Sequence, residues 1–283
     1  MKLGFNLLLW ATYITENQFH LLDDLKKAVY DGVEIPLFEG DTAHYAKLGN
    51  RIKNLGMSSS SVTVMFGGNA ISPDKALRQR ALDHLKWAID CSAALGSDVL
   101  AGPFHQPLGE FSGSGPTEDE KKYCADVHKA ASQYAAKANL KLSVEPLNRF
   151  ECYFLNTARD SESLVKRVDE PNYGYLYDTF HFNIEEKSQP EAIRSTIKSI
   201  NHVHISENDR GTPGSGQIDF AAVFKALKSS GYDGWLTVEA FGSALPDLAA
   251  ATKIWRPLFD KPEDVYQGAF KLMSQGWAAA QRA

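Results

Sequence analysis

Residues 140–151, LKLSVEPLNRFE, describe a short strand that ends in a carboxylate. Leu140, Leu142 and Val144 alternate with polar residues, and Pro146 stops the strand because proline cannot donate a hydrogen bond to a sheet. This pattern predicts that Glu145 lies at the C-terminal tip of a strand. An isolated glutamate at such a place is more often a surface residue than a functional one, so the rest of the chain has to decide its role.

The same arrangement recurs three more times towards the C-terminus. Asp178 ends the apolar run 173–177, His204 lies near the end of the run 200–205, and Glu239 ends the run 235–238. Each run delivers one hard metal-ligating group at the same end of a strand. We therefore expect the four side chains to converge.

Outward from these runs, short apolar stretches alternate with longer amphipathic ones along the whole chain. This alternation is typical of a parallel sheet with crossover helices. The predicted strands are residues 3–9, 33–37, 57–65, 98–101, 140–144, 173–177, 200–205 and 235–238. The predicted helices are residues 18–30, 42–55, 72–95, 117–138, 160–168, 190–197, 220–229 and most of 246–283. Eight units of each kind predict an α/β fold, a (β/α)8 TIM barrel that forms one domain over residues 1–283.

The longest irregular stretch is residues 102–116, which are rich in Gly, Pro and Ser. A mid-chain segment of this composition can link two domains. Because the alternation resumes in phase after it, we interpret it as a long loop over the active site between a strand and a helix.

Composition and charge narrow the classes of function. The chain has 283 residues, 43% of them hydrophobic and 23% charged, with a formal net charge of −5. This balance gives no basic field for a nucleic-acid backbone. No stretch approaches the ~20 apolar residues of a membrane helix, and residues 1–10 are interpreted as a strand rather than a signal peptide. Cys91, Cys124 and Cys152 lack C-x-x-C spacing, which favours reduced thiols in the cytoplasm.

Functional residues of such barrels lie at the C-terminal ends of the strands. Glu145, Asp178, His204 and Glu239 are all predicted to lie on that rim. Three carboxylates and one imidazole suit a divalent cation, Mn²⁺ above all, with Mg²⁺ or Co²⁺ as alternatives, whereas the lack of thiolates argues against structural zinc. Without a cation the carboxylates would repel one another.

Open positions on such a cation suit the carbonyl and adjacent hydroxyl of a ketose. A cation there polarises the carbonyl and stabilises an enediolate, which eases removal of the neighbouring C–H proton. Glu145 and Glu239 come from strands three apart in the ring, so they are expected to face opposite sides of a bound sugar. One carboxylate then removes the proton and the other returns it, and the outcome is epimerisation.

Four motifs carry a family resemblance, and they occur in the C-terminal half in the family's order. They are VEPLNRFE (144–151), DTFHFNIEE (178–186), HVHISENDR (202–210) followed by PGSG (213–216), and GYDG (231–234) with VEAF (238–241). With these motifs the chain resembles the D-tagatose 3-epimerase/D-allulose (psicose) 3-epimerase family of xylose isomerase-like barrels. The resemblance implies that Glu145, Asp178, His204 and Glu239 bind the metal and that Glu145 and Glu239 exchange the proton.

The resemblance also implies a substrate and its contacts. Members of the family typically act on free ketohexoses or ketopentoses of the D-tagatose, D-allulose/D-fructose or L-ribulose type, use Mn²⁺ or Co²⁺, and form homodimers or homotetramers. Glu151, His181 and Arg210 are implied to contact the sugar near C1 to C3. The N-terminal half matches more weakly, through SPDK (72–75). There the family's substrate pocket is lined at positions that hold Asn6, Trp10, Met65, Phe104 and residues 105–116.

Several alternatives remain open at this stage. An aldose–ketose isomerase of the hydroxypyruvate or L-rhamnose isomerase type uses the same scaffold, as does an inosose dehydratase. A related endonuclease would need several more histidines and a basic groove. A metal- or sugar-binding protein without catalysis is a further alternative. His202 is two residues from His204 and faces the same side of its strand, one layer deeper, where we expect it to support its neighbour or fill the core.

Overall fold

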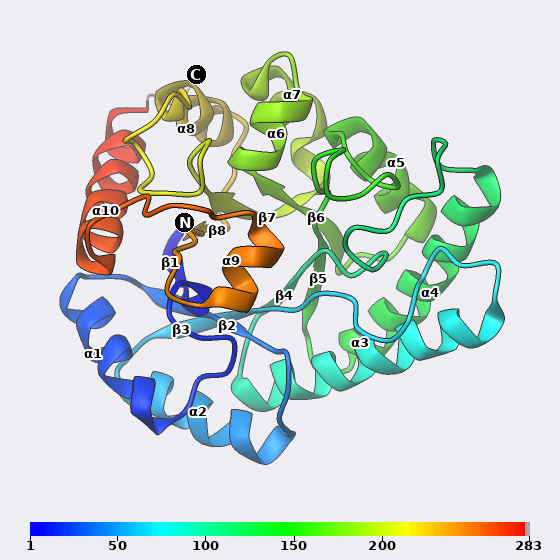
Figure 1. Cartoon of the computed structure of the whole chain (residues 1–283), viewed down its shortest axis with the longest axis horizontal. Coiled ribbons are helices and arrows are strands. Elements are labelled where there is room, and N and C mark those ends of the chain that lie inside the picture. The colour runs from blue at the N-terminus through cyan, green and yellow to red at the C-terminus, as the bar shows by residue number, and fades with distance from the viewer. Residues whose placement is uncertain (281–283) are drawn as a thin grey trace.

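Eight strands form a closed parallel barrel that the helices surround (Figure 1). The computed structural model describes residues 1–280. Each strand pairs with its sequence neighbours, and β1 pairs with β8 to close the ring. The strands are β1 (Lys2–Asn6), β2 (Gly32–Pro36), β3 (Ser58–Val62), β4 (Val99–Gly102), β5 (Lys141–Val144), β6 (Tyr173–Asp178), β7 (Ile200–Ile205) and β8 (Trp235–Val238).

The helices follow the strands in the order that the sequence predicts, with two additions. They are α1 (Phe19–Lys27), α2 (Thr42–Asn54), α3 (Lys75–Leu95), α4 (Glu118–Ala136), α5 (Ala158–Val168), α6 (Thr179–Glu185), α7 (Gln189–Thr196), α8 (Phe220–Ser229), α9 (Pro246–Thr252) and α10 (Pro262–Ala279). The predicted (β/α)8 barrel is thereby confirmed. The helix-rich C-terminal region is found as α9 and α10, and residues 281–283 of that prediction lie outside the described part of the chain.

Some predicted boundaries were wrong for local reasons. The strand predicted over 3–9 ends at Asn6, whose side chain accepts a hydrogen bond from the Leu8 amide at 2.9 Å, and Leu7–Leu9 forms a 3₁₀ helix. The strand predicted over 57–65 ends at Val62. Helix α3 begins after Asp74, which caps it in place of Ser72. The helix α6 was not predicted, because it directly follows β6 without a turn.

Buried apolar residues lie on both faces of the strands, as expected for a parallel barrel covered by helices. The outer part lies between barrel and helices and contains fully buried residues such as Phe5, Val33 and Tyr175. Burial of each such side chain stabilises the fold by about 1.5–3 kcal/mol. A smaller cluster of Val99, Ala101, Leu176 and Trp235 comes from β4, β6 and β8.

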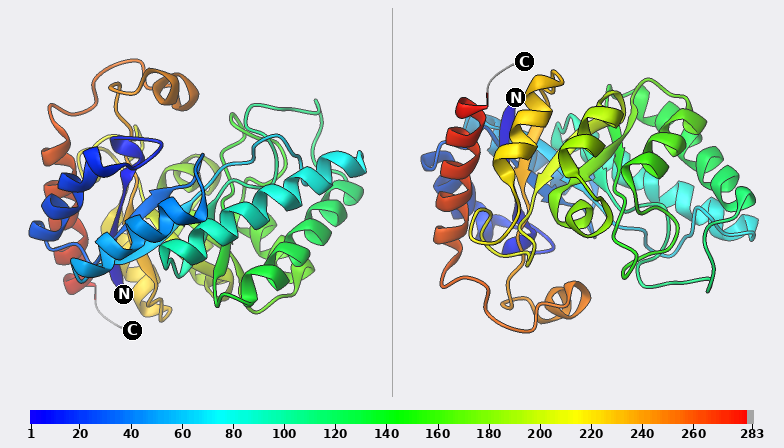
Figure 2. Two further views of the ribbon diagram at one scale, coloured as in Figure 1. Left: turned by 90° about the horizontal axis from the view of Figure 1, so that it is seen from below. Right: turned by 90° about the horizontal axis from the view of Figure 1, so that it is seen from above.

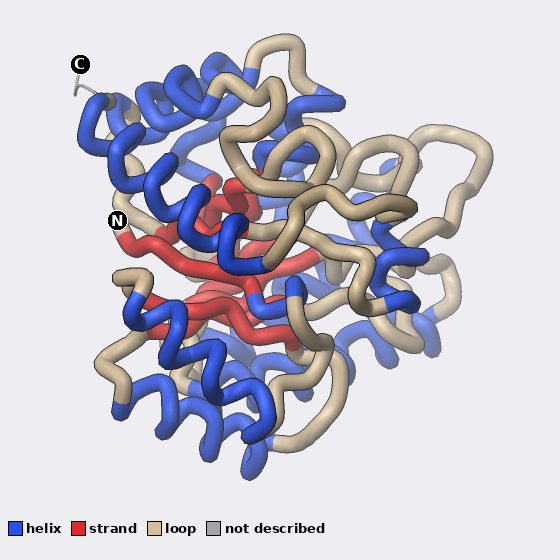
Figure 3. Tube along the Cα trace, turned by 60° about the vertical axis from the view of Figure 1, so that its left-hand side comes forward, coloured by secondary structure: helices blue, strands red, loops and turns tan. Residues whose placement is uncertain are grey.

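The longer loops gather at one end of the barrel, which positions the site. Figure 3 shows the strands in the centre, the helices around them and the loops grouped at one side. Figure 2 shows α9 standing apart from the ring of helices, on the long connection between β8 and α10. No helix within residues 1–280 combines the length and the apolar character needed to span a bilayer.

Candidate metal centre and active site

Four predicted ligand residues come together at the C-terminal ends of four consecutive strands. Glu145 directly follows β5, Asp178 ends β6, His204 lies in β7 and Glu239 directly follows β8. All four are buried, and one potential ligand atom from each lies within 4.8 Å of the others. The structure therefore forms a cluster with the donor set that the sequence predicted for a divalent cation.

Backbone contacts hold Glu145 and Asp178, the first two residues of the cluster, in place. The Glu145 amide donates to the Gly102 carbonyl at 2.9 Å. Gly102 has φ +127°, and a Cβ there would lie 2.0 Å from the Thr63 carbonyl oxygen, so only glycine fits at this end of β4. Asp178 caps α6 by accepting from the Phe180 amide through Oδ1 at 2.7 Å. Its Oδ2 is thereby left to face the cluster.

His204 offers one nitrogen to the cluster and uses the other for support. Its Nε2 lies 2.7 Å from Glu34 Oε1, whereas its Nδ1 has no hydrogen-bond partner and lies 3.5 Å from Glu239 Oε1. A buried imidazole nitrogen without a partner is costly unless something binds it. One imidazole nitrogen among three carboxylates suits a cation of intermediate hardness, so the residues present fit a divalent metal.

Arg210 supplies the positive charge next to the cluster. Its Nη1 donates to Asp178 Oδ2 at 2.9 Å and to Glu239 Oε2 at 2.6 Å. The guanidinium carbon lies 3.9 Å from the centroid of the Phe180 ring and 5.1 Å from that of Phe241. Stacking between the two rings, together with an Nη1 group shared by two carboxylates, holds the planar guanidinium in one orientation.

His181 faces both Arg210 and Glu145. The Asn148 amide donates to His181 Nδ1 at 3.0 Å. His181 Nε2 lies 2.8 Å from Arg210 Nη2, which can only donate, and 3.6 Å from Glu145 Oε1. The Asn148 side chain also donates to Glu151 Oε1 at 2.8 Å. Sequence analysis missed Asn148, although it belongs to the NRFE part of the first motif.

The carboxyl groups of the cluster differ in pKa. Burial, helped by the charge of Glu239, raises the pKa of Glu145 well above its ordinary value. Burial also raises the pKa of Asp178, to about 6. For Glu239, burial is outweighed by His204 and Arg210, which lower the pKa. The pKa of Glu145 is therefore higher than that of its neighbour Glu239, and such a difference is typical of a pair in which one carboxyl group acts as an acid and the other as a base.

These pKa shifts predict how the stability of the metal-free protein depends on pH. The pKa values of Glu145 and His204 are higher in the folded chain than in the unfolded chain. The stabilising effect of each group is complete at pH values below its unfolded pKa, and it is lost as the pH rises through its folded pKa. The buried His105, His128 and His181 have lowered pKa values and oppose this trend only below about pH 6.5. Above about pH 7, we expect stability to fall as pH rises.

Thermal melts of the metal-stripped chain between pH 7 and 9, with and without Mn²⁺, measure this trend. Saturating Mn²⁺ is expected to remove the decline, because metal ligands bind in their deprotonated forms. A melting temperature of the metal-free chain that stays level or rises over this range would contradict the account.

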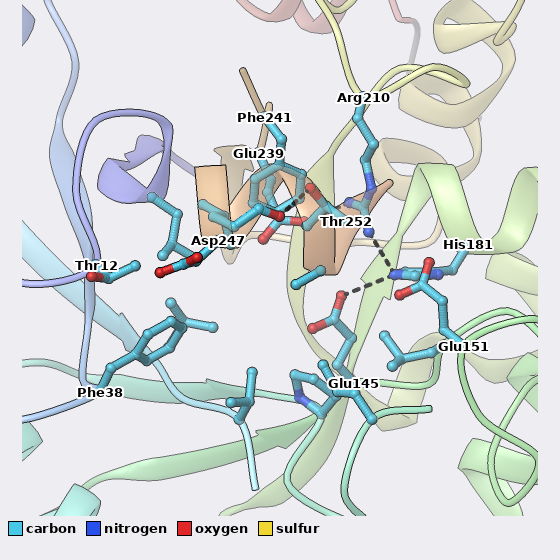
Figure 4. A pocket seen from close by; sticks show the side chains of 18 of the residues that line it. Thr12, Phe38, Glu145, Glu151, His181, Arg210, Glu239, Phe241, Asp247 and Thr252 are labelled. Atoms are coloured by element: carbon cyan, nitrogen blue, oxygen red, sulfur yellow. Dashed lines mark hydrogen bonds and ion pairs between the residues drawn. The ribbon is translucent and has the colours of Figure 1, made fainter. Parts of the chain in front are cut away.

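The cluster opens into a cavity of about 370 Å³, within the size range of small-molecule pockets. Figure 4 shows Glu145, Glu151, His181, Arg210 and Glu239 grouped at one side of it, with dashed contacts linking His181 to Arg210 and to Glu145. The remaining wall is mostly apolar and consists of Leu8, Phe38, Val62, Val64, Phe66, Pro103, Leu108, Leu147, Phe241, Leu248 and Ala251, together with Thr12, Asp247 and Thr252.

Four residues expected at the pocket lie elsewhere. Asn6 donates to Glu34 and Glu239 instead of reaching the cavity wall, Met65 and Phe104 belong to the hydrophobic core, and Trp10 packs against that core. Their sequence neighbours Val64, Phe66 and Pro103 line the cavity. Successive side chains of an extended chain point to opposite sides. A residue one position away from a predicted pocket residue therefore faces the cavity, while the predicted residue itself faces the core. The sequence did not predict that residues of α9 line the cavity, because the position of this helix depends on the folded chain.

Comparison with known proteins agrees with this geometry. Residues 22–271 match the family model described as the xylose isomerase-like TIM barrel. The chain is 31% identical over 276 residues to a probable ketose 3-epimerase of Synechocystis sp., covering 97% of this chain and 96% of that protein.

Two solved structures extend the comparison. A structure of an L-ribulose 3-epimerase superposes with a TM-score of 0.93 at 30% identity, covering 99% of this chain and 95% of that one. A D-allulose 3-epimerase from Methylomonas sp., solved in complex with D-allulose, gives a TM-score of 0.90 at 26% identity, covering 97% and 96%.

This chain belongs to the xylose isomerase-like TIM barrel family. Its relatives are ketose 3-epimerases, and the chain is an isomerase-class sugar epimerase.

Proposed function

We propose that this chain is a metal-dependent ketose 3-epimerase that interconverts free ketohexoses or ketopentoses at C3. One observation carries the proposal: Glu145 and Glu239 belong to the same four-residue cluster, arise from β5 and β8, and line one cavity. Two carboxylates placed around a common binding position suit proton removal on one face and proton return on the other. The names of the relatives, which include ketose, L-ribulose and D-allulose 3-epimerases, support the same reaction.

We propose Mn²⁺ as the metal, with Mg²⁺ or Co²⁺ as alternatives, held by Glu145, Asp178, His204 and Glu239. The donor set of three carboxylates and one imidazole supports this choice. When bound, the cation polarises the ketose carbonyl and stabilises the negative charge that develops on its oxygen as the C3 proton leaves.

The protein side chains then bind the sugar and move the proton. His181 Nε2 and Arg210 lie next to Glu145, and we assign both side chains to the sugar oxygens near C1 to C3, with Glu151 accepting from a hydroxyl. One of Glu145 and Glu239 takes the C3 proton through a carboxylate oxygen. The other then delivers a proton to the opposite face, and the configuration at C3 is inverted.

The cavity favours sugars without a phosphate. Arg210 is the only Lys or Arg among the residues that line it in the described chain, and its Nη1 already contacts Asp178 and Glu239. Asp247 on α9 adds a carboxylate to the wall. A phosphorylated ketose would therefore meet negative charge with no free cation to pair with its phosphate.

Incubation of the Mn²⁺-loaded protein in heavy water tests the reaction. With D-fructose, D-tagatose and L-ribulose as substrates, we expect the C3 epimer of at least one, with deuterium at C3 of the product. An aldose product with deuterium at C1 or C2 would instead show an aldose–ketose isomerase, and loss of water from a carbocyclic polyhydroxy ketone, supplied in a separate incubation, would show a dehydratase. Sugar binding without any exchange would show a binding protein.

We also propose that residues 1–283 form one domain that assembles as a homodimer or homotetramer in the cytoplasm. Cys91, Cys124 and Cys152 are buried and form no disulfide, which supports a reducing compartment. Phe150 and Trp255 are 69% and 71% exposed, which supports burial of apolar surface against a further copy. Sedimentation equilibrium measures the subunit number.

A further inference from the structure

Glu34 lies inside the barrel, behind the metal centre. It is the third residue of β2 and is fully buried. Its strand neighbours in the ring are Asn6 on β1 and Ser60 on β3. A carboxylate in such a place is strongly destabilising unless charged or polar partners surround it, so its contacts are expected to serve a purpose.

Four donors fill the acceptor positions of this carboxylate. Oε1 accepts from Asn6 Nδ2 at 3.0 Å and from His204 Nε2 at 2.7 Å. Oε2 accepts from Ser60 Oγ at 2.9 Å and from His202 Nε2 at 2.7 Å. Two donors on each oxygen use the four lone-pair positions of a carboxylate.

These contacts exclude a second cation between Glu34 and the two imidazoles. Glu34, His202 and His204 form a group whose potential ligand atoms lie close together. At 2.7 Å, however, each Nε2–oxygen distance is that of a direct hydrogen bond, which leaves no space for an ion between them. The group therefore supports the metal centre instead of forming a second one.

The contacts also determine which nitrogen of His204 is free. An ionised carboxylate only accepts, so the proton of His204 that faces Glu34 stays on Nε2. In the neutral ring, which is the form that binds a metal, Nδ1 then carries the lone pair; in this structure Nδ1 has no hydrogen-bond partner and lies 3.5 Å from Glu239 Oε1. Asn6 extends the support, because its Nδ2 also donates to Glu239 Oε1 at 3.2 Å.

We propose that Glu34 is the positioning residue of the metal centre: it holds the proton of His204 on Nε2 so that Nδ1 faces the cation, and through Asn6 it orients Glu239. One buried carboxylate thus sets two of the four ligands. Residues that orient metal-binding imidazoles in this way change metal affinity without touching the metal. The inference rests on the metal site of the proposed function. It assigns to that site a supporting residue, Glu34, which does not line the cavity.

Glu34→Gln is the matched test. An amide offers one acceptor and one donor group, so it cannot accept from both imidazoles, and the variant pushes a proton towards Nδ1 of His204 or His202. Isothermal titration of the metal-stripped full-length chain with Mn²⁺ is expected to show affinity weakened by about 10- to 100-fold. The control is the same substitution at an exposed position, Glu118→Gln on α4, and its affinity is expected to stay within about 2-fold of wild type.

A second measurement needs no variant. In the ¹⁵N-histidine spectrum of the Mg²⁺-loaded wild-type chain, His204 is expected to carry its proton on Nε2 and none on Nδ1. The inference would be overturned if Glu34→Gln bound Mn²⁺ as tightly as wild type, or if His204 of the wild-type chain carried its proton on Nδ1. Either result would leave the proposed function unaffected. A wild-type chain that binds no divalent metal would overturn both.

Discussion

Glu239→Gln and Glu145→Gln are each expected to lower the turnover of the best ketose substrate on the order of 10²–10⁴-fold. Each variant removes a proton carrier and weakens a metal ligand while nearly preserving shape. Both residues are about 4% exposed and lie on the cavity wall, so the loss cannot be replaced by solvent at that position. Steady-state kinetics with saturating Mn²⁺ measure the effect, with Glu118→Gln on the outer surface of α4 as a control that should keep wild-type turnover.

The two variants also differ from each other in a way that tests the two-sided reaction. If the carboxylates act on opposite faces of the sugar, each variant keeps residual exchange of the C3 hydrogen only for the epimer that the remaining carboxylate faces. Heavy-water incubation of both epimers should therefore give complementary patterns. Equal residual exchange of both epimers in both variants would contradict two separate proton carriers.

Arg210→Met is expected to destabilise the metal-free protein by about 3–5 kcal/mol, since breaking a buried ion pair leaves uncompensated charge. Arg210 is 6% exposed and contacts both Asp178 and Glu239, so its removal leaves two buried carboxylates without their guanidinium partner. Urea unfolding at pH 8 measures the loss. Saturating Mn²⁺ is expected to restore part of it, because ligand binding stabilises the folded state.

Arg149→Met provides the matched comparison. Arg149 pairs with Glu185 but its side chain is 56% exposed, so the same substitution there is expected to change stability by about 0–1 kcal/mol. A loss below about 1 kcal/mol for Arg210→Met, similar to that of this surface pair, would mean that Arg210 does not balance the charge of the centre.

The barrel and the cluster of four proposed ligands could be predicted because each depends on local sequence. Hydrophobic period and segment length distinguish the strands from the helices, and residues at the C-terminal ends of the strands gather at one rim of the barrel. Asp178 is the last residue of β6, Glu145 and Glu239 directly follow β5 and β8, and His204 lies one position before the end of β7.

Other features depend on the closed ring and carry no local signal. Glu34 sits in an apolar run and contacts His202 and His204, which are 168 and 170 residues away, only because β2 and β7 face each other inside the barrel. Val64 and Phe66 line the cavity in place of Met65 because β3 ends at Val62, earlier than the sequence pattern predicted. The contribution of α9 depends on the path of residues 239–245, which no periodic pattern describes.

The central claim is that one divalent cation binds where β5, β6, β7 and β8 end. Crystals of the wild-type chain grown with Mn²⁺, measured at the manganese absorption edge, test it most directly. We predict one anomalous peak per chain, in contact with Glu145, Asp178, Glu239 and Nδ1 of His204. A crystal with no peak at this position, or with manganese bound only elsewhere, would contradict the claim.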